Sequence, residues 1–241
     1  MPSFVLALTN AEKDLQDQKI YLMGKFDPSL RKDFMAIPLK YTVVRNKMYL
    51  RKETYWAFIL MRNSALKDKV NLKIASATRN FEYQKDLWNQ KWEGTTIVVG
   101  QNLLTTIPDE LERFKKILEY SAVPGTSRHH WGADIDINTA SPEYFNSEKG
   151  AREYDWLVLN APKFGFCQTY TKKDDKKDNQ RKTGYSEEKW HWSYLPISKQ
   201  LTQDYNNIII KDDLKEFDGY QYVEKIDLIN GYVLSINPEC L

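Results

Sequence analysis

The chain has 241 residues, enough to bury one substantial hydrophobic core. Hydrophobic residues make up 41% and charged residues 28% of it, which is ordinary for a soluble globular protein. The net charge of +2, from 35 basic and 33 acidic residues, is too small to indicate a nucleic acid or an anionic membrane as partner. No apolar run approaches the roughly 20 residues of a transmembrane helix.

The first 50 residues contain short, mixed elements. Residues 10–18 are predicted to begin a helix, residues 24–28 are typical of a turn, and residues 41–44 favour a strand. The opening residues 1–8 have no basic region and too short an apolar run for a signal peptide. Either the protein stays inside the cell, or these residues begin a mature form to which an initiator Met was added.

Hydrophobic spacing then predicts interspersed helices and strands. Helices are predicted at residues 54–67, 80–92, 109–120 and 147–162, the last with Ser147 as its N-cap and Gly165 as its terminator. Strands are predicted at residues 72–75, 133–138 and 166–170 and through Trp192 and Tyr194, with residues 133–138 alternating as a half-buried strand does. Because the order is not a strict alternation of strand and helix, the sequence favours an α+β fold.

The same spacing identifies the apolar positions of three helices. Those near helical spacing in the first are Trp56, Ile59, Leu60 and Leu66, and those sharing one face of the third are Leu111, Phe114, Ile117 and Leu118. The inner stripe expected for the fourth is Tyr154, Leu157, Val158 and Ala161.

No internal repeat or long linker divides the chain. We expect an N-terminal extension, residues 1–60, packed on a catalytic domain, residues 61–241, with the last 22 residues also packed against that domain. The charged run at residues 172–182 is expected to be a solvated loop, with a mobile lid over a cleft as the functional alternative. Cys167 lies in an apolar run, which favours a buried free thiol, and a bridge to Cys240 is the open alternative.

Two short segments, residues 127–136 and 188–191, hold all three histidines of the chain. His129, Asp136 and His191 offer two nitrogens and one carboxylate oxygen, a set that suits Zn²⁺. Three protein ligands leave one position for water, which distinguishes a catalytic zinc site from a structural one. The competing interpretation is that these histidines, in segments that also contain tryptophan, are simply packed in the core. His130 is expected to be a packed ring or to support a ligand, but not to be one.

The local structure expected around these residues allows them to converge. Gly132 has no Cβ, so the backbone can turn and bring His129 toward Asp136 on the following strand. His191 would come from a neighbouring strand. Glu188 precedes it by three residues, a spacing that suits a turn carrying the carboxylate over the open position of the metal. There it could take a proton from water and pass it to a leaving amine.

These two segments resemble the zinc D-alanyl-D-alanine carboxypeptidases of the VanY type, whose pattern is SxHxxGxAxD followed by ExxH, usually Glu-Pro-Trp-His. The matching positions are Ser127, His129, Gly132, Asp136, Glu188, Trp190 and His191. Two positions depart from the pattern. Asp134 replaces an alanine and places an extra carboxylate near the metal, where it could support a ligand. Lys189 replaces the proline and spares every chemical group.

A third segment, residues 76–84, is similar to that family's Ser-Gly-Tyr-Arg-Ser-x-x-x-Gln. The resemblance implies that Arg79 contacts substrate and stabilises the oxyanion, and that Gln84, Ser127 and Trp190 help to hold substrate. Without it, Arg79 would be interpreted as a surface or helix-capping arginine. The resemblance covers roughly residues 70–195.

The resemblance implies a zinc metallopeptidase with one Zn²⁺ per chain, carried by a small, largely antiparallel central sheet flanked by helices. Its implied substrate is a peptidoglycan stem peptide or muropeptide, cleaved at D-alanyl-D-alanine or a related D-amino-acid bond. The alternatives are a peptidoglycan endopeptidase on the same scaffold, or a zinc-containing binding domain without turnover, as in hedgehog signalling proteins. Glu188 argues against the last, because a structural site needs no positioned base. The expected location is the periplasm or cell envelope after loss of a signal peptide, with the cytoplasm as alternative.

Overall fold

The computed structural model describes residues 9–174 and 181–241. The opening residues 1–8, and residues 175–180 of the predicted loop or lid, lie outside this description. Across the described ranges, no helix combines the length and apolar character needed to cross a membrane.

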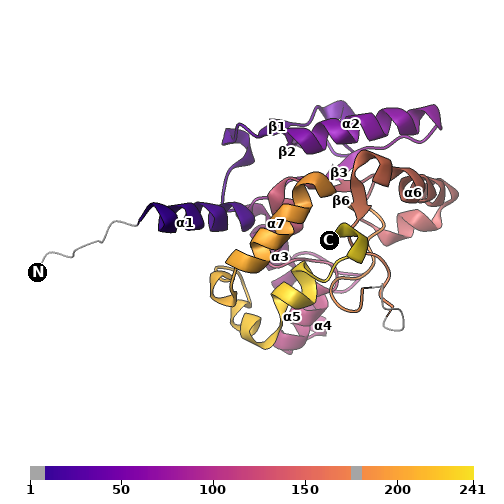
Figure 1. The fold of residues 1–241 in the computed structure, drawn as a ribbon. Helices are drawn as coiled ribbons and strands as arrows, with labels where there is room; N and C mark the ends of the chain where they lie inside the picture. The colour runs from indigo at the N-terminus through magenta and orange to yellow at the C-terminus, as the bar shows by residue number, and fades with distance from the viewer. Residues whose placement is uncertain (1–8, 175–180) are drawn as a thin grey trace, which may run out of the picture.

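A four-stranded antiparallel sheet forms the centre of the fold (Figure 1). Its strands are β3 (Ile74–Ser76), β4 (Asp134–Ile137), β5 (Phe166–Gln168) and β6 (His191–Tyr194), in the order β3-β4-β6-β5. A separate antiparallel pair joins β1 (Phe34–Ala36) to β2 (Tyr49–Arg51). The predicted α+β fold with a small antiparallel sheet is therefore confirmed.

Helices surround the central sheet. They are α1 (Asn10–Leu22), α2 (Lys52–Lys67), α3 (Phe81–Trp92), α4 (Leu103–Thr106), α5 (Glu110–Leu118), α6 (Glu148–Asn160) and α7 (Leu195–Ile208). Figure 1 shows α2 in one layer with β1 and β2, and α4 and α5 toward the opposite end of the molecule. Side-chain caps fix several starts: Asn80 accepts from the backbone of Tyr83, and Ser147, as predicted, accepts from that of Gly150.

The pleat of the sheet separates two kinds of side chain. Ile135 and Ile137 on β4 and Trp192 on β6 enter a core that α2 and α6 cover. Because neighbouring side chains on a strand point to opposite faces, Asp134 and Asp136 on β4 face the other way, as does His191 on β6. That second face lies toward the larger core built with α3, α5 and α7. All four residues of β4 are buried, so the half-buried strand predicted there is wrong: packed structure covers both faces.

The apolar positions predicted for two helices need correction. Trp56, Leu60 and Leu66 of α2 are 57%, 63% and 43% exposed, and Val158 of α6 is 51% exposed. In α2 apolar residues occur on more than one face, so helical spacing alone did not identify the buried one. The residues that α2 buries instead are Tyr55, Ala57, Phe58, Met61 and Ala65. In α5, Phe114, Ile117 and Leu118 are buried as predicted.

Other differences concern long-range contacts. A disulfide joins Cys167 of β5 to Cys240, 73 residues later, so the favoured free thiol is wrong and the alternative of a bridge is correct. The C-terminal stretch packs into the larger core as expected, with Val223 and Val233 buried. Residues 41–44 do not form the predicted strand, and only Thr42 makes an isolated bridge, to Ile74. Residue 60 lies within α2, and the division into an extension and a catalytic domain stays a prediction.

Candidate metal and catalytic site

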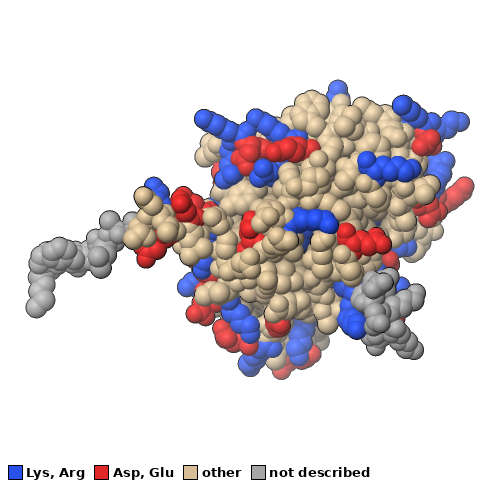
Figure 2. Space-filling model, viewed as in Figure 1, with Lys and Arg blue, Asp and Glu red and all other residues tan. Residues whose placement is uncertain are grey.

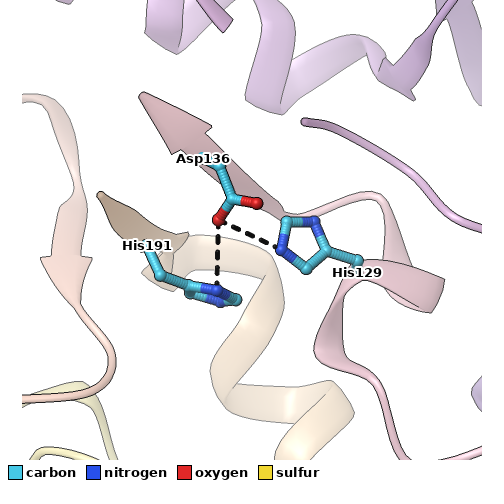
Figure 3. Close-up of side chains that lie close together, drawn as sticks. All are labelled: His129, Asp136 and His191. Carbon is cyan, nitrogen blue, oxygen red and sulfur yellow. Dashed lines mark ion pairs between the residues drawn. The ribbon is translucent and has the colours of Figure 1, made fainter. Parts of the chain in front are cut away.

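Three buried side chains converge on the inner face of the sheet (Figure 3). His129 comes from a short 3₁₀ helix (Arg128–Trp131), Asp136 from β4 and His191 from β6. Oδ1 of Asp136 lies 3.3 Å from Nε2 of His129 and 3.4 Å from Nδ1 of His191. One donor atom from each residue lies within 4.8 Å of the other two, a spacing suited to a shared ion.

Local sequence explains the convergence. The antiparallel register places Asp136 directly opposite His191. Gly132 adopts a φ of +70°, and a Cβ there would lie 2.4 Å from the ring of Phe34. Only glycine can make this turn between His129 and β4 without strain or a clash, as the sequence indicated.

Hydrogen bonding leaves a lone pair of His129 directed into the cluster. Its Nδ1 lies 2.9 Å from the carbonyl oxygen of Ala77, which can only accept, so Nδ1 carries the proton. Burial, together with the nearby Arg79, lowers the pKa of His129 to about 4 and keeps the ring neutral. Nε2 of His129 and Oδ1 of Asp136 then face each other without a hydrogen-bond partner. A cation would satisfy both acceptors.

Asp134 orients the second histidine. Its Oδ2 lies 2.8 Å from Nε2 of His191, and it also accepts from Nε of Arg128 at 3.1 Å and from Oγ of Ser193 at 2.5 Å. Burial favours the neutral acid, but Arg128 and His191 outweigh it and lower the pKa of Asp134. The ionised carboxylate therefore accepts the Nε2 proton, which turns Nδ1 of His191 toward Asp136. Asp134, which replaces the alanine of the pattern, thus orients His191, a candidate metal ligand.

The electrostatics of the cluster favour a cation. Burial opposes a charge on His191, but contacts with Asp134, Asp136 and Glu188 outweigh it and raise the pKa of the ring well above its usual value. Only one of these carboxylates, Asp134, has a fully buried arginine partner. A bound metal would displace the proton from Nδ1 of His191, and two imidazole nitrogens with a carboxylate oxygen would then form a donor set that suits Zn²⁺.

Glu188 sits at the edge of this cluster. The backbone N–H of His191 donates to the carbonyl of Glu188 at 3.3 Å, which closes the predicted turn between them. Oε2 of Glu188 lies 3.3 Å from Nδ1 of His191. Burial raises the pKa of Glu188 above its ordinary value, so the group is a stronger base than an exposed carboxylate.

Arg79 lies beside Asp136 of the cluster. Its guanidinium Nη2 lies 4.0 Å from Oδ2 of Asp136, and its Nε has no partner. The backbone of Arg79 is fixed twice, because its N–H donates to the carbonyl of His129 and its own carbonyl accepts from Nδ1 of His130. His130 also accepts from the N–H of Gly125 at 3.1 Å, so this ring joins three segments and is not part of the cluster.

The remaining predicted contacts fall in different places. Ser127 lines a small cavity of about 30 Å³ beside the cluster, and Trp190 lines a larger one of about 410 Å³. Both cavities reach Arg79 and Glu188. Gln84 is buried and donates to the carbonyl of Ala122 at 2.7 Å. This contact supports the segment before the metal motif, and a direct contact of Gln84 with substrate stays a prediction.

Sequence reasoning missed several cavity residues. Tyr170 and Tyr185 line the small cavity, Lys91 lines the larger one, and Tyr120 lines both. The ring of Tyr170 packs 4.8 Å from that of His191. Only Lys91 carried a usable signal, since it follows Gln84 by seven residues and so shares its helix face.

Charged side chains do not gather into one large patch on the face seen in Figure 2, where basic and acidic groups are interspersed. This agrees with the near-neutral composition.

The fold and the buried cluster define an α+β protein with a candidate catalytic metal site. Residues 47–197 match the family described as VanY, D-alanyl-D-alanine carboxypeptidase. The match spans more than half of the chain, and the chain therefore belongs to this family of carboxypeptidases.

Individual relatives agree with this assignment. The chain is 28% identical over 229 residues to the putative carboxypeptidase YodJ of Bacillus subtilis, covering 93% of this chain and 70% of the relative. It is 29% identical over 133 residues to a D-alanyl-D-alanine carboxypeptidase of Enterococcus faecalis, covering 48% of this chain and 46% of the relative. The solved structure of the LdcB LD-carboxypeptidase superposes with a TM-score of 0.51 at 22% identity, covering 81% of each chain, which shows a shared fold.

Proposed function

We propose that this protein is a zinc-dependent carboxypeptidase that removes a terminal D-alanine, or a related D-amino acid, from peptidoglycan stem peptides. The observation that carries the proposal is the buried cluster of His129, Asp136 and His191, with acceptor atoms left unpaired, beside Glu188 and Arg79. Family membership supports the same reaction class.

In this proposal, His129, Asp136 and His191 hold one zinc ion. When bound, zinc supplies Lewis acidity, which polarises a carbonyl oxygen and makes water a stronger acid. Glu188, with its raised pKa, accepts the proton of the attacking water and delivers it to the leaving amine. Arg79 places its guanidinium where negative charge develops on the scissile carbonyl, held there by backbone contacts to His129 and His130.

Family membership favours a carboxypeptidase over the endopeptidase alternative, because the matching family is described by its D-alanyl-D-alanine carboxypeptidase activity. Ser127, Tyr170 and Tyr185 line the small cavity beside the cluster, where they could contact the terminal residue of a peptide.

Defined muropeptides test the proposal. We expect zinc-loaded protein to release one terminal residue from a peptide ending in D-Ala-D-Ala or in a single D-Ala, detected as a mass loss of one alanine. The Glu188→Gln variant should keep its zinc and bind the same peptide, while turnover falls by about 10²–10⁴. Cleavage inside cross-linked peptides without loss of a terminal residue would identify an endopeptidase. Binding without any cleavage by the wild type would identify a binding domain.

The substrate also suggests a location. Since peptidoglycan lies outside the cytoplasmic membrane, we propose that the protein acts in the periplasm or cell envelope. Cell fractionation tests this, and purely cytoplasmic protein would instead indicate recycling of soluble wall fragments.

A further inference from the structure

Lys91 is a cavity residue for which the proposed reaction has no role. It shares one face of α3 with Gln84 and Trp88, at seven and three residues' distance. Gln84 donates to the carbonyl of Ala122 and Trp88 to that of Asp218, so two hydrogen bonds to other segments hold this face of the helix in place. The last turn of α3 therefore holds Lys91 against the larger cavity, where its Nζ donates to Oγ of Ser121.

Lys91 makes no direct ion pair among the described residues, and the carboxylates of Asp136, Glu143 and Glu188 line the same cavity without contacting it. Within residues 9–174 and 181–241, no ion pair at or below 4.0 Å includes Lys91, and its hydrogen-bond partner Ser121 is a neutral hydroxyl. Desolvation by burial, together with the charge of Arg79, outweighs the opposing effect of Glu188 and lowers the pKa of Lys91 to about 8. A largely desolvated ammonium beside a second cation is unfavourable unless an anion joins it.

A strained turn at the rim of the same cavity also indicates ligand binding near Lys91. Val99 has a φ of +48° and Gly100 a φ of +75°, forming a tight turn between the paired residues Val98 and Gln101. A positive φ is costly for a β-branched residue, and such strain concentrates at ligand-binding sites. The turn leaves Val99 and Ile97, both cavity-lining residues, 67% and 57% exposed.

We propose that Lys91 and Ser121 form a carboxylate-recognition site that determines which stem peptides this enzyme selects. The inference rests on the proposed function, because the bound group belongs to the substrate peptide. Arg79 and Glu188 line the same cavity, so a peptide reacting at the cluster extends past Lys91. The carboxylate is either the C-terminal one or that of an acidic residue further along the peptide. Lys91 is a specificity residue, away from the reacting atoms.

Three peptides distinguish these sources: one with both carboxylates free, one with its C-terminus amidated, and one with its internal acidic residue amidated. Binding is measured by calorimetry on zinc-loaded Glu188→Gln protein, which removes turnover from the readout. We expect Lys91→Met to weaken binding of the free peptide by about tenfold or more, the effect of a charged hydrogen bond. Amidation of the carboxylate that Lys91 recognises should abolish this difference, so that Lys91→Met and its parent bind that peptide equally well. The peptide for which the difference disappears therefore identifies the recognised carboxylate.

Two further variants sharpen the result. Lys91→Arg keeps the charge and should retain most of the preference, whereas Lys85→Met is the matched control, because Lys85 pairs with Glu82 on the surface of the same helix. In the active enzyme, Lys91→Met should raise KM with little change in kcat. If Lys91→Met is unfolded by circular dichroism, Lys91→Gln replaces it.

Equal affinities of Lys91→Met and the control for all three peptides would overturn the proposal, as would the failure of every peptide to bind. Failure of the proposed function has a different signature. In that case the wild type cleaves none of the peptides, while the calorimetric preference still reports on Lys91.

Discussion

Asp134→Asn separates two effects of one buried carboxylate. Three donors, from His191, Arg128 and Ser193, converge on its Oδ2, and the side chains of Asp134 and Arg128 are fully buried. Asparagine keeps the shape but removes the charge. We expect zinc affinity to fall by about 10- to 100-fold, the usual result of losing an oriented carboxylate behind a ligating histidine. We also expect metal-free protein to lose about 3–5 kcal/mol of unfolding free energy, because the charge of Arg128 stays buried without a partner.

The double variant Arg128→Met with Asp134→Asn tells the two effects apart. It removes the unpaired charge, so urea unfolding of the metal-free protein should show most of the lost stability regained. Zinc affinity, measured by competition with a chromogenic chelator, should stay low because His191 still lacks its carboxylate. Wild-type zinc affinity in Asp134→Asn would refute the reasoning. Recovery of zinc affinity in the double variant would mean that Asp134 serves only to neutralise Arg128.

Three other changes have defined outcomes. Arg79→Ala should lower kcat by about 10²–10³ with zinc content unchanged. Arg79→Lys should recover little activity, because a point charge does not reproduce the planar guanidinium. Wild-type kinetics in Arg79→Ala would mean that Arg79 has only a structural role. Cys240→Ser opens the 73-residue loop closed by the disulfide and should lower the unfolding free energy in urea by about 2–4 kcal/mol, an effect that dithiothreitol should reproduce in the wild type. Val99→Asn should raise the unfolding free energy by about 1 kcal/mol, since asparagine tolerates a positive φ. An unchanged or lower midpoint of urea unfolding would show that the turn is not strained.

Local signals explain what the sequence predicted well. Ser147 begins α6 with its own hydroxyl, and Gly132 makes the turn that its position before β4 indicated. The segments around His129 and Glu188 are short and chemically distinctive, so they could be recognised without knowing the contacts between them. The structure brings His129, Asp136 and His191 within 4.8 Å, while their roles toward zinc stay proposals.

Features that depend on distant residues could not be predicted in this way. The face that α2 buries was misjudged because Trp56 and Leu60 compete with Phe58 and Met61, and only the shape of the opposing sheet decides between them. The helix α7 received no prediction. The disulfide of Cys167 depends on a chain end 73 residues away.

The contact between Asp134 and His191 could be predicted from the sequence only in part. The sequence indicated a carboxylate near the metal, but the contact with His191 requires the antiparallel register of β4 and β6. Lys91 likewise carries the helical spacing of Gln84, yet only the folded structure shows that it lines the same cavity as Arg79 and Glu188.

Titrating zinc into metal-stripped protein, while alanine release from a D-Ala-D-Ala-terminated peptide is followed, tests the central proposal most directly. The wild type should be inactive after chelation and should regain activity in proportion to added zinc, reaching its maximum at one ion per chain. His191→Ala, which removes one proposed ligand, should neither bind zinc stoichiometrically nor recover. Full activity without metal, or recovery of His191→Ala at the same ratio as the wild type, would contradict the proposal that this cluster holds a catalytic zinc.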